Sequence, residues 1–230
     1  MTLPGPDPPR GHLAGFTYRF VPGGDTGEDP GYVLLLLHGT GGDENDLLPL
    51  GSMLAPGAPL VSPRGGVLEA GMPRFFRRVR PGVFDVEDLR ARAAELAAFV
   101  AAARVEHGLE HRPWVAVGFS NGANIAGGVL LEHPSALQGA VLLRPMLPFS
   151  PATPPSLAGI PVLIAAGDQD PYGSPEQVAL LRELLEAGKV VPSIGDVYPL
   201  SEVPKAIRLF GEAHQKGKIV ITIRAAPSMS

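Results

Sequence analysis

One segment constrains this chain more than any other: Trp114–Asn124, which reads WVAVGFSNGAN. Its apolar start predicts a short strand, and the small and apolar residues that follow it predict a helix. Gly118 and Gly122 lie two residues on either side of Ser120, so the chain can turn sharply there without a Cβ clash. The helix N-terminus beside the serine favours negative charge. The segment therefore predicts a nucleophilic serine; the alternative is an ordinary strand-to-helix turn with a solvated hydroxyl.

A second glycine-rich turn follows the apolar run Tyr32–Leu37, which predicts a strand buried on both faces of a parallel sheet. The turn, His38–Gly42, reads HGTGG, and a short helix is expected after it, over Asp46–Leu54. A glycine loop after a buried strand can bring backbone N–H groups close to a ligand. The Lys-Ser/Thr ending of a phosphate loop is missing. The other use is one half of an oxyanion hole, with the N–H of Thr40 as a donor.

The bulk composition suits one α/β domain over residues 1–230, with a loosely held, Pro/Gly-rich N-terminus at 1–15. Hydrophobic residues make up 45% of the chain, enough for a sizeable core. The net charge of −4 gives no basic field for nucleic acid. The absence of cysteine excludes disulfides and a thiol nucleophile. With no signal-peptide pattern and no apolar run of membrane-spanning length, we expect a cytoplasmic protein that makes no membrane contact.

The segment Arg74–Arg80 (RFFRRVR) combines four arginines with two phenylalanines. It has two interpretations. The first, which the charge favours, is a solvated loop anchored by its two aromatic side chains. The second is the wall of a pocket near the serine.

A helix is expected after Asp85, whose side chain can cap its N-terminus. Leu89, Ala93, Leu96, Val100 and Ala103 give this helix one apolar face. Gly108 ends it. The residues around that glycine, His107–His111, read HGLEH and match the H-x-x-E-H metal motif. That chemistry needs both histidines on one helical face, so we expect two exposed loop histidines instead.

Two more strands are expected, at Phe16–Val21 on the sheet edge and at Gly139–Leu143 after the serine unit. A further buried strand, Ile160–Ala166, leads into the sequence GDQDP. An acid at the carboxyl end of such a strand can lie near a serine on a neighbouring strand. Asp170 is the first candidate and Asp168 the second; for each, the alternative is turn or helix capping.

In this order the pieces resemble the phospholipase/carboxylesterase family of α/β-hydrolases, the group that includes acyl-protein thioesterase-like esterases. The resemblance covers about residues 31–187 and rests on the segments LLLLHGTGGDENDL, SPRGG, RFF, FDVEDL, GFSNGA, LRPMLPF and GDQDP. It implies the α/β-hydrolase fold, a mostly parallel central sheet with helices on both faces. It implies Ser120 as nucleophile, Asp170 as triad acid, and an oxyanion hole from the backbone N–H groups of Thr40 and Asn121. It also implies that His38 is structural and that no metal or cofactor is required.

The C-terminal tail does not fit this family. The family resemblance places a catalytic histidine near Tyr198–Pro204, where the chain has none. Instead Ala187–Ile223 resembles the C-terminal end of medium-chain dehydrogenases of the quinone-reductase type. We therefore expect a chimera joined near Leu184–Gly188. The tail brings no dinucleotide site, because the chain has no glycine fingerprint followed by a ribose-binding acid.

The tail leaves His214 as the one histidine downstream of Asp170. The order Ser…Asp…His makes it the candidate base by elimination, and the alternative is a solvated loop histidine. It lies between an expected helix at Ser201–Gly211 and an expected strand at Lys218–Ile223.

The resulting expectation is a serine carboxylesterase that hydrolyses short-chain carboxylic esters or thioesters through an acyl-enzyme on Ser120. Its partner would be a small-molecule ester. The alternatives are a catalytically impaired hydrolase scaffold that binds acyl ligands and, from the tail alone, a nicotinamide-dependent reductase. Because the foreign tail replaces the helix that normally covers one face of the sheet, a homodimer is expected, with exchange of tails as one form.

Overall fold

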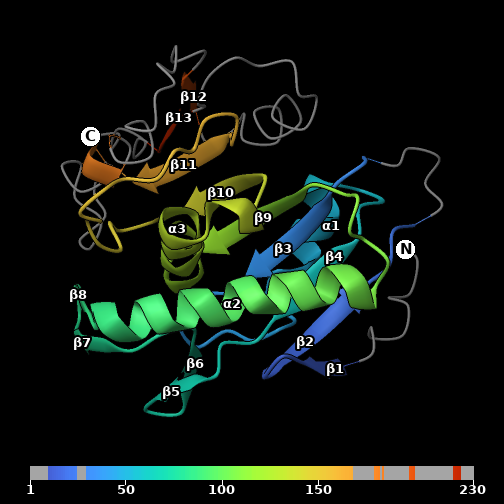
Figure 1. The fold of residues 1–230 in the computed structure, drawn as a ribbon, viewed down its shortest axis with the longest axis horizontal. Coiled ribbons are helices and arrows are strands. Elements are labelled where there is room, and N and C mark those ends of the chain that lie inside the picture. Colours follow the sequence, from blue (N-terminus) through green and yellow to red (C-terminus); the bar gives the residue numbers. More distant parts are fainter. Residues whose placement is uncertain are drawn as a thin grey trace, which may run out of the picture.

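The computed structural model describes residues 10–24, 30–167, 179–181, 183, 197–199 and 220–223. Nine strands form one sheet in the order β1-β2-β4-β3-β9-β10-β11-β13-β12 (Figure 1). In that order they are β1 (Arg10–Leu13), β2 (Phe16–Val21), β4 (Leu60–Pro63), β3 (Val33–Leu37), β9 (Trp114–Phe119), β10 (Gly139–Leu143), β11 (Val162–Gly167), β13 (Val220–Ile223) and β12 (Val197–Pro199). Only the β1–β2 and β2–β4 pairs of this sheet are antiparallel. The mostly parallel sheet agrees with the expected α/β class.

Helices cover both faces of the sheet, as Figure 1 shows, with α2 and α3 in front and α1 behind. Their bounds are α1 (Leu48–Leu54), α2 (Val86–Glu106) and α3 (Asn121–Glu132), followed by the short 3-10 helix η1 (Pro134–Ala136). Two small antiparallel hairpins lie outside the main sheet: β5 (Val67–Glu69) with β6 (Met72–Arg74), and β7 (Arg78–Arg80) with β8 (Val83–Phe84).

The apolar run of β3 serves two cores. Val33, Leu35 and Leu37 belong to the core that contains residues of α2 and α3. Leu34 and Leu36 belong to a second core, against which residues of α1 pack. Alternate side chains of a strand point to opposite faces, so a strand covered on both sides must be apolar at every position. This strand confirms the interpretation of its sequence.

The structure overturns the expectation that residues 1–15 are all loosely held and that β2 is an edge strand. Arg10 begins β1, which pairs with β2 as a hairpin. The turn residues Ala14 and Gly15 have φ values of 46° and 83°, the conformation that two-residue hairpin turns require. Arg10 also lies 2.7 Å from the carboxylate of Glu44, which is fully buried. A tight turn and an ion pair therefore fix a segment whose Pro/Gly content suggested a loose end.

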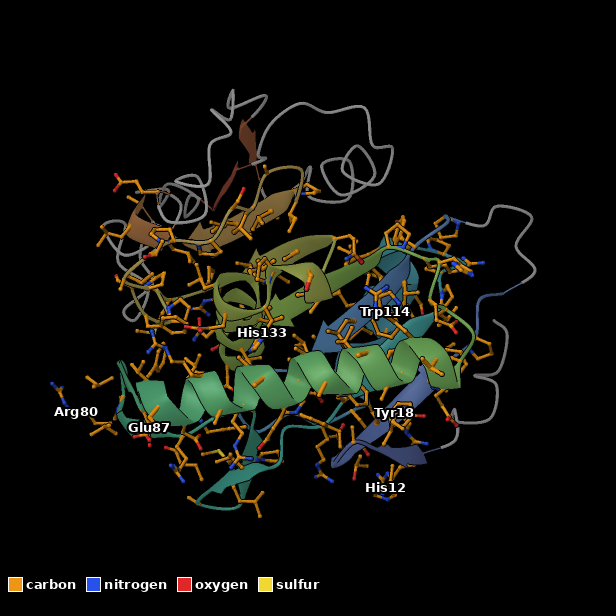
Figure 2. The ribbon with its side chains drawn as sticks, in the orientation of Figure 1. His12, Tyr18, Arg80, Glu87, Trp114 and His133 are labelled. Carbon is orange, nitrogen blue, oxygen red and sulfur yellow. The ribbon has the colours of Figure 1, made fainter. Side chains whose placement is uncertain are left out.

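Helix α2 begins and ends as expected. The Asp85 carboxylate accepts a hydrogen bond from the N–H of Asp88 at 3.1 Å, and His107 is the C-terminal cap. His107 is not an exposed loop residue, however. Its Nε2 lies 3.0 Å from the hydroxyl of Tyr18. Figure 2 shows Tyr18 beneath the C-terminal half of α2. Its ring stacks on Phe20 with centroids 3.7 Å apart. His107 therefore has a packing role that its sequence motif did not indicate.

The tail adds two strands to the same sheet. β13 pairs with β11 and β12 pairs with β13, both in parallel. The expected strand at 218–223 is confirmed at Val220–Ile223. The expected helix at Ser201–Gly211 lies outside the described residues. In the part of the chain that is described, no helix is both long and apolar enough to cross a membrane.

Candidate active site

The turn between β9 and α3 places Ser120 in an unusual backbone conformation, with φ 51° and ψ −108°. Few non-glycine residues have positive φ, and such residues concentrate at functional sites. The Ser120 N–H donates to the carbonyl of Leu143 on β10 at 2.8 Å. Its side chain makes no capping hydrogen bond to α3. The hydroxyl therefore does not have the capping role that an ordinary serine at a helix start would have.

The two flanking glycines are required by close contacts rather than by their own dihedral angles. A Cβ on Gly118 would lie 2.5 Å from the carbonyl oxygen of Gly122. A Cβ on Gly122 would overlap the carbonyl of Leu37 at the end of β3. The turn predicted from the glycine spacing is thus present, with its strained dihedral angles at the serine itself.

The HGTGG loop lies beside this turn, at the end of β3. The N–H of Gly41 donates to Pro73 at 3.0 Å, and the N–H of Gly42 donates to Gly39 at 3.1 Å. The N–H of Thr40 donates to no other described residue. Thr40 and Asn121 line the same cavity as Ser120. The structure therefore brings the two expected oxyanion donors together around the serine.

His38, at the start of that loop, is fully buried and uses both ring nitrogens. Nδ1 lies 2.7 Å from the carbonyl of Gly39, and Nε2 accepts a hydrogen bond from the N–H of Gly65 at 2.9 Å. Burial lowers the pKa of the His38 imidazole. Both contacts are satisfied by the neutral ring with its proton on Nδ1. His38 therefore joins two loops, as a structural residue would.

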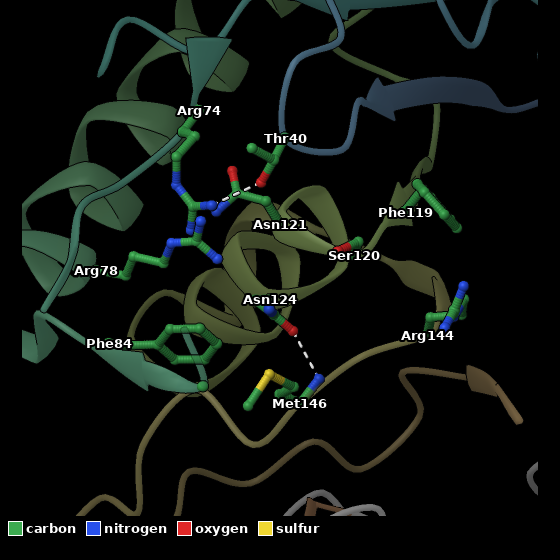
Figure 3. A pocket seen from close by; sticks show the side chains of 11 residues that line it. Thr40, Arg74, Arg78, Phe84, Phe119, Ser120, Asn121, Asn124, Arg144 and Met146 are labelled. Atoms are coloured by element: carbon green, nitrogen blue, oxygen red, sulfur yellow. Dashed lines mark hydrogen bonds between the residues drawn. The ribbon is translucent and has the colours of Figure 1, made fainter. Parts of the chain in front are cut away.

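The cavity beside Ser120 has a volume of about 330 Å³ (Figure 3). Its wall combines polar and cationic side chains with aromatic and methionine side chains. The described lining residues are Thr40, Arg74, Arg78, Gly82, Phe84, Phe119, Ser120, Asn121, Asn124, Arg144 and Met146.

The segment Arg74–Arg80 agrees with the second interpretation and with part of the first. It is not a solvated loop throughout, because Arg74 is buried at the end of β6 and Arg78–Arg80 form β7. Phe75 and Phe76 are buried anchors. Arg74 and Arg78 line the cavity, where Figure 3 shows their guanidinium groups side by side. Both contact one carboxylate, that of Glu69: Arg78 Nη2 lies 2.7 Å and Arg74 Nε 3.2 Å from it. Hydrogen bonds from Arg78 lower the pKa of Glu69, so this carboxylate is held in its charged form.

Two asparagines on α3 attach the cavity walls to the helix. Asn121 Oδ1 accepts a hydrogen bond from the N–H of Phe75 at 2.8 Å. Asn124 Oδ1 accepts one from the N–H of Met146 at 2.7 Å. The buried Nδ2 of Asn121 has no hydrogen-bond partner among the described residues. Sequence reasoning missed Asn124, Phe84 and Met146. Asn124 could have been found from the sequence, because it lies four residues after Ser120 and residues four apart on a helix share a face.

Two expected triad members lie outside the described residues: Asp170, together with the second candidate Asp168, and His214. Their sequence neighbours are partly described. β11 ends at Gly167, beside β10 and parallel to it, so it ends at the same edge of the sheet as β9. β13 is parallel to β11. The carboxyl ends of these strands meet at the edge that carries Ser120.

Known proteins resemble the chain over most of its length. It is 48% identical over 157 residues to MhqD of Bacillus subtilis (strain 168), provisionally named a hydrolase; the match covers 68% of this chain and 78% of that protein. A carboxylesterase structure from Bacillus cereus is 43% identical, with a TM-score of 0.77 and coverage of 86% and 94% of the two chains. The chain belongs to the phospholipase/carboxylesterase family of α/β-hydrolases. A further member, a carboxylesterase from Mesorhizobium loti, is 31% identical with a TM-score of 0.67, over 96% and 91% of the two chains.

One comparison concerns the tail of this family member. A model described as zinc-binding dehydrogenase matches residues 142–221, less than half of the chain. The match agrees with the expected dehydrogenase-like tail, but it begins within β10, well before the expected join. The chain offers no cysteine for zinc. Its described residues also gather no group of three or more His, Asp or Glu side chains that could hold a metal. The described residues therefore do not fit a zinc site.

Proposed function

We propose that this family member is a serine carboxylesterase that hydrolyses short-chain carboxylic esters or thioesters through an acyl-enzyme on Ser120. The observation that carries the proposal is the strained Ser120 turn, which lines one cavity with Thr40 and Asn121. The carboxylesterases it resembles support the reaction class. Neither a metal nor an organic cofactor is needed for this chemistry.

In the proposed first half-reaction, the hydroxyl oxygen of Ser120 attacks the carbonyl carbon of the ester. His214 takes the serine proton and Asp170 stabilises the resulting imidazolium. The backbone N–H groups of Thr40 and Asn121 donate to the carbonyl oxygen as it becomes negative. Each such donor typically contributes about 3 kcal/mol to the barrier reduction. The alcohol or thiol then leaves with the proton.

In the second half-reaction, water attacks the acyl-enzyme and gives its proton to the same base. The carboxylic acid leaves and Ser120 regains its proton. The N-terminus of α3 lies beside the serine, and its orphan N–H groups stabilise negative charge in both half-reactions. Because the Ser120 side chain makes no cap to the helix, no capping hydrogen bond has to break before it reacts.

The test compares hydrolysis of p-nitrophenyl butyrate by the intact protein and by Ser120→Ala. A fall in kcat of about a thousandfold or more is expected, since removal of a triad member leaves only residual catalysis. Ser52→Ala, an exposed serine on α1, is the matched control and should retain full activity. Mass spectrometry after reaction with a fluorophosphonate should show one adduct, on Ser120. Full activity of Ser120→Ala would overturn the proposal.

A second candidate is an impaired hydrolase that binds acyl ligands but releases them slowly. It is favoured by the dehydrogenase-like tail, which replaces the expected histidine loop. Rapid steady-state turnover of p-nitrophenyl butyrate would exclude it. A single burst of p-nitrophenol followed by a very slow phase would favour it over the first candidate, because Ser120 would then be acylated without efficient deacylation.

A further inference from the structure

Cationic side chains predominate over anionic ones among the described residues that line the cavity beside Ser120. Among its described lining residues are three arginines, Arg74, Arg78 and Arg144, and no Asp or Glu. Figure 3 shows Arg74 and Arg78 on one side of the cavity and Arg144 on the other, with Ser120 between them in that view. Guanidinium groups are fixed cations at any physiological pH. Such a wall favours an anionic group on a ligand, while Phe84, Phe119 and Met146 leave apolar surface for an acyl chain.

Glu69 offsets part of the charge of Arg74 and Arg78. Its one carboxylate is shared by two guanidinium groups, those of Arg74 and Arg78. The cluster of three side chains therefore keeps a net charge of one positive unit. Arg74 is almost fully buried, and burial together with Arg78 lowers the pKa of its guanidinium. Two cations held next to each other at a partly buried wall are costly unless an anion lies nearby.

A second observation points in the same direction. Asn121 is buried, and its Nδ2 group lacks a hydrogen-bond partner among the described residues although the residue lines the cavity. A buried donor without an acceptor is unfavourable. An oxygen atom of a bound ligand would satisfy it. The lining next to the serine thus combines a cationic wall with a buried amide donor that lacks an acceptor among the described residues.

We infer that the site prefers esters that carry a free carboxylate, which binds at the Arg74–Arg78 wall while Ser120 attacks the ester carbonyl. Arg78 is the principal specificity residue. Its Nε and Nη2 bind Glu69, but its side chain is partly exposed at the cavity. Arg74 is almost fully buried and is held by Thr40 and by the carbonyl of Phe76. The inference rests on the proposed function and adds a substrate class to it. The carboxylate can belong to the acyl part or to the alcohol part of the ester.

Two pairs of substrates test it, each matched except for charge. The first pair is p-nitrophenyl hydrogen adipate and p-nitrophenyl hexanoate, which place the carboxylate on the acyl part. The second pair is 4-carboxyphenyl butyrate and its methyl ester, which place it on the alcohol part. The intact protein should show a kcat/KM about 10-fold or more higher for the charged member of at least one pair, as expected for a charge-assisted hydrogen bond. The preference should weaken as salt is raised, because ions screen exposed charges.

Variants at Arg78 and at Arg80 test whether Arg78 causes the preference for the charged substrate. Arg78→Gln should lower the charged-to-neutral kcat/KM ratio by about 10-fold, and Arg78→Lys should retain most of it. Because the ratio is taken within one protein, a general loss of folded enzyme does not change it. Arg80→Gln is the control: Arg80 is exposed on the same strand, outside the cavity, and projects away from the sheet in Figure 2. It should leave the ratio unchanged.

The inference is overturned if the intact protein shows no preference in either pair, or if Arg78→Gln leaves the ratio unchanged. Those results would leave the proposed function intact, because Ser120→Ala tests it separately with a neutral ester. Should Ser120 prove inactive, calorimetric titration of Ser120→Ala with monomethyl adipate still decides the matter. Binding that Arg78→Gln weakens about 10-fold supports the cationic subsite, and the absence of binding overturns it.

Discussion

Arg74 Nη1 donates a hydrogen bond to the hydroxyl of Thr40 at 2.6 Å. Arg74 is the last residue of β6, whereas Thr40 lies in the loop after β3. The contact therefore links Thr40, beside Ser120, to the arginine wall of the cavity. Thr40 is exposed and its backbone N–H is the proposed oxyanion donor. A side-chain hydrogen bond thus orients a residue whose main chain is proposed to act in catalysis.

Thr40→Val keeps the shape of the side chain but removes the acceptor. We expect kcat to fall about 10-fold, a part of the loss seen when an oxyanion donor is removed outright, while KM changes little. Thr40→Ser, which keeps the hydroxyl, should restore kcat. Steady-state kinetics with p-nitrophenyl butyrate measures both. A change confined to KM would show that Thr40 contacts the ground-state substrate instead.

His214→Ala tests the displaced base. If the tail supplies the general base, kcat for p-nitrophenyl butyrate should fall by about a thousandfold or more, as it does for the loss of other triad members. His133→Ala, a change at the histidine that caps the end of α3, is the control for a histidine outside the proposed triad. Equal activity of the intact protein and His214→Ala would place the base elsewhere.

Gly122→Ala should destabilise the fold severely, because the added Cβ would overlap the carbonyl of Leu37. Leu37 ends β3 in the sheet and Gly122 lies in α3, which packs against that sheet. Overpacking of this kind costs about 3 kcal/mol or more when backbone must move. Gly66→Ala adds the same methyl group where no atom lies within 4 Å of it, so it should be nearly neutral. Urea denaturation of both variants gives the free energies of unfolding. Equal stability would contradict the close approach.

Acid should destabilise the protein before its carboxylates titrate. Burial lowers the pKa of His38 and of His107 below the ordinary value of 6.5. As pH falls through 6.5, the unfolded chain takes up protons that the folded chain does not, so the free energy of unfolding decreases. The decrease should continue down to the lower folded pKa values. His38→Asn should flatten this slope in urea denaturation between pH 7 and pH 5; an unchanged slope would show that His38 does not contribute.

The homodimer stays a prediction of the sequence. β12 and β13 of the tail pair with β11 of their own chain, so a dimer would form either beside this arrangement or by exchange of the same strands. Light scattering of the intact protein at several concentrations measures its mass. A monodisperse monomer at every concentration would contradict the prediction.

Local sequence sufficed for the elements whose pattern is dictated by neighbours in the chain. The apolar run of β3 predicts a strand covered on both faces, and the glycine spacing around Ser120 predicts the strand–turn–helix. Asp85 and Gly108 bracket α2 for the same reason: capping and chain reversal depend on nearby backbone groups. Composition misled at Arg10, because an ion pair with the distant Glu44 holds a segment that resembles a loose terminus.

The sequence by itself determined the family, the nucleophile candidate and the loop expected to face it, since these depend on short motifs whose geometry is local. Only the tertiary structure decided what surrounds Ser120. Arg74 and Arg78 lie more than forty positions earlier in the chain, and the sequence left their segment open between solvent and cavity. They reach the cavity because the Phe75 N–H bonds to Asn121 and the buried phenylalanines fix the segment against the core. Contacts between residues far apart in sequence depend on how the elements pack together, and no local pattern records that packing.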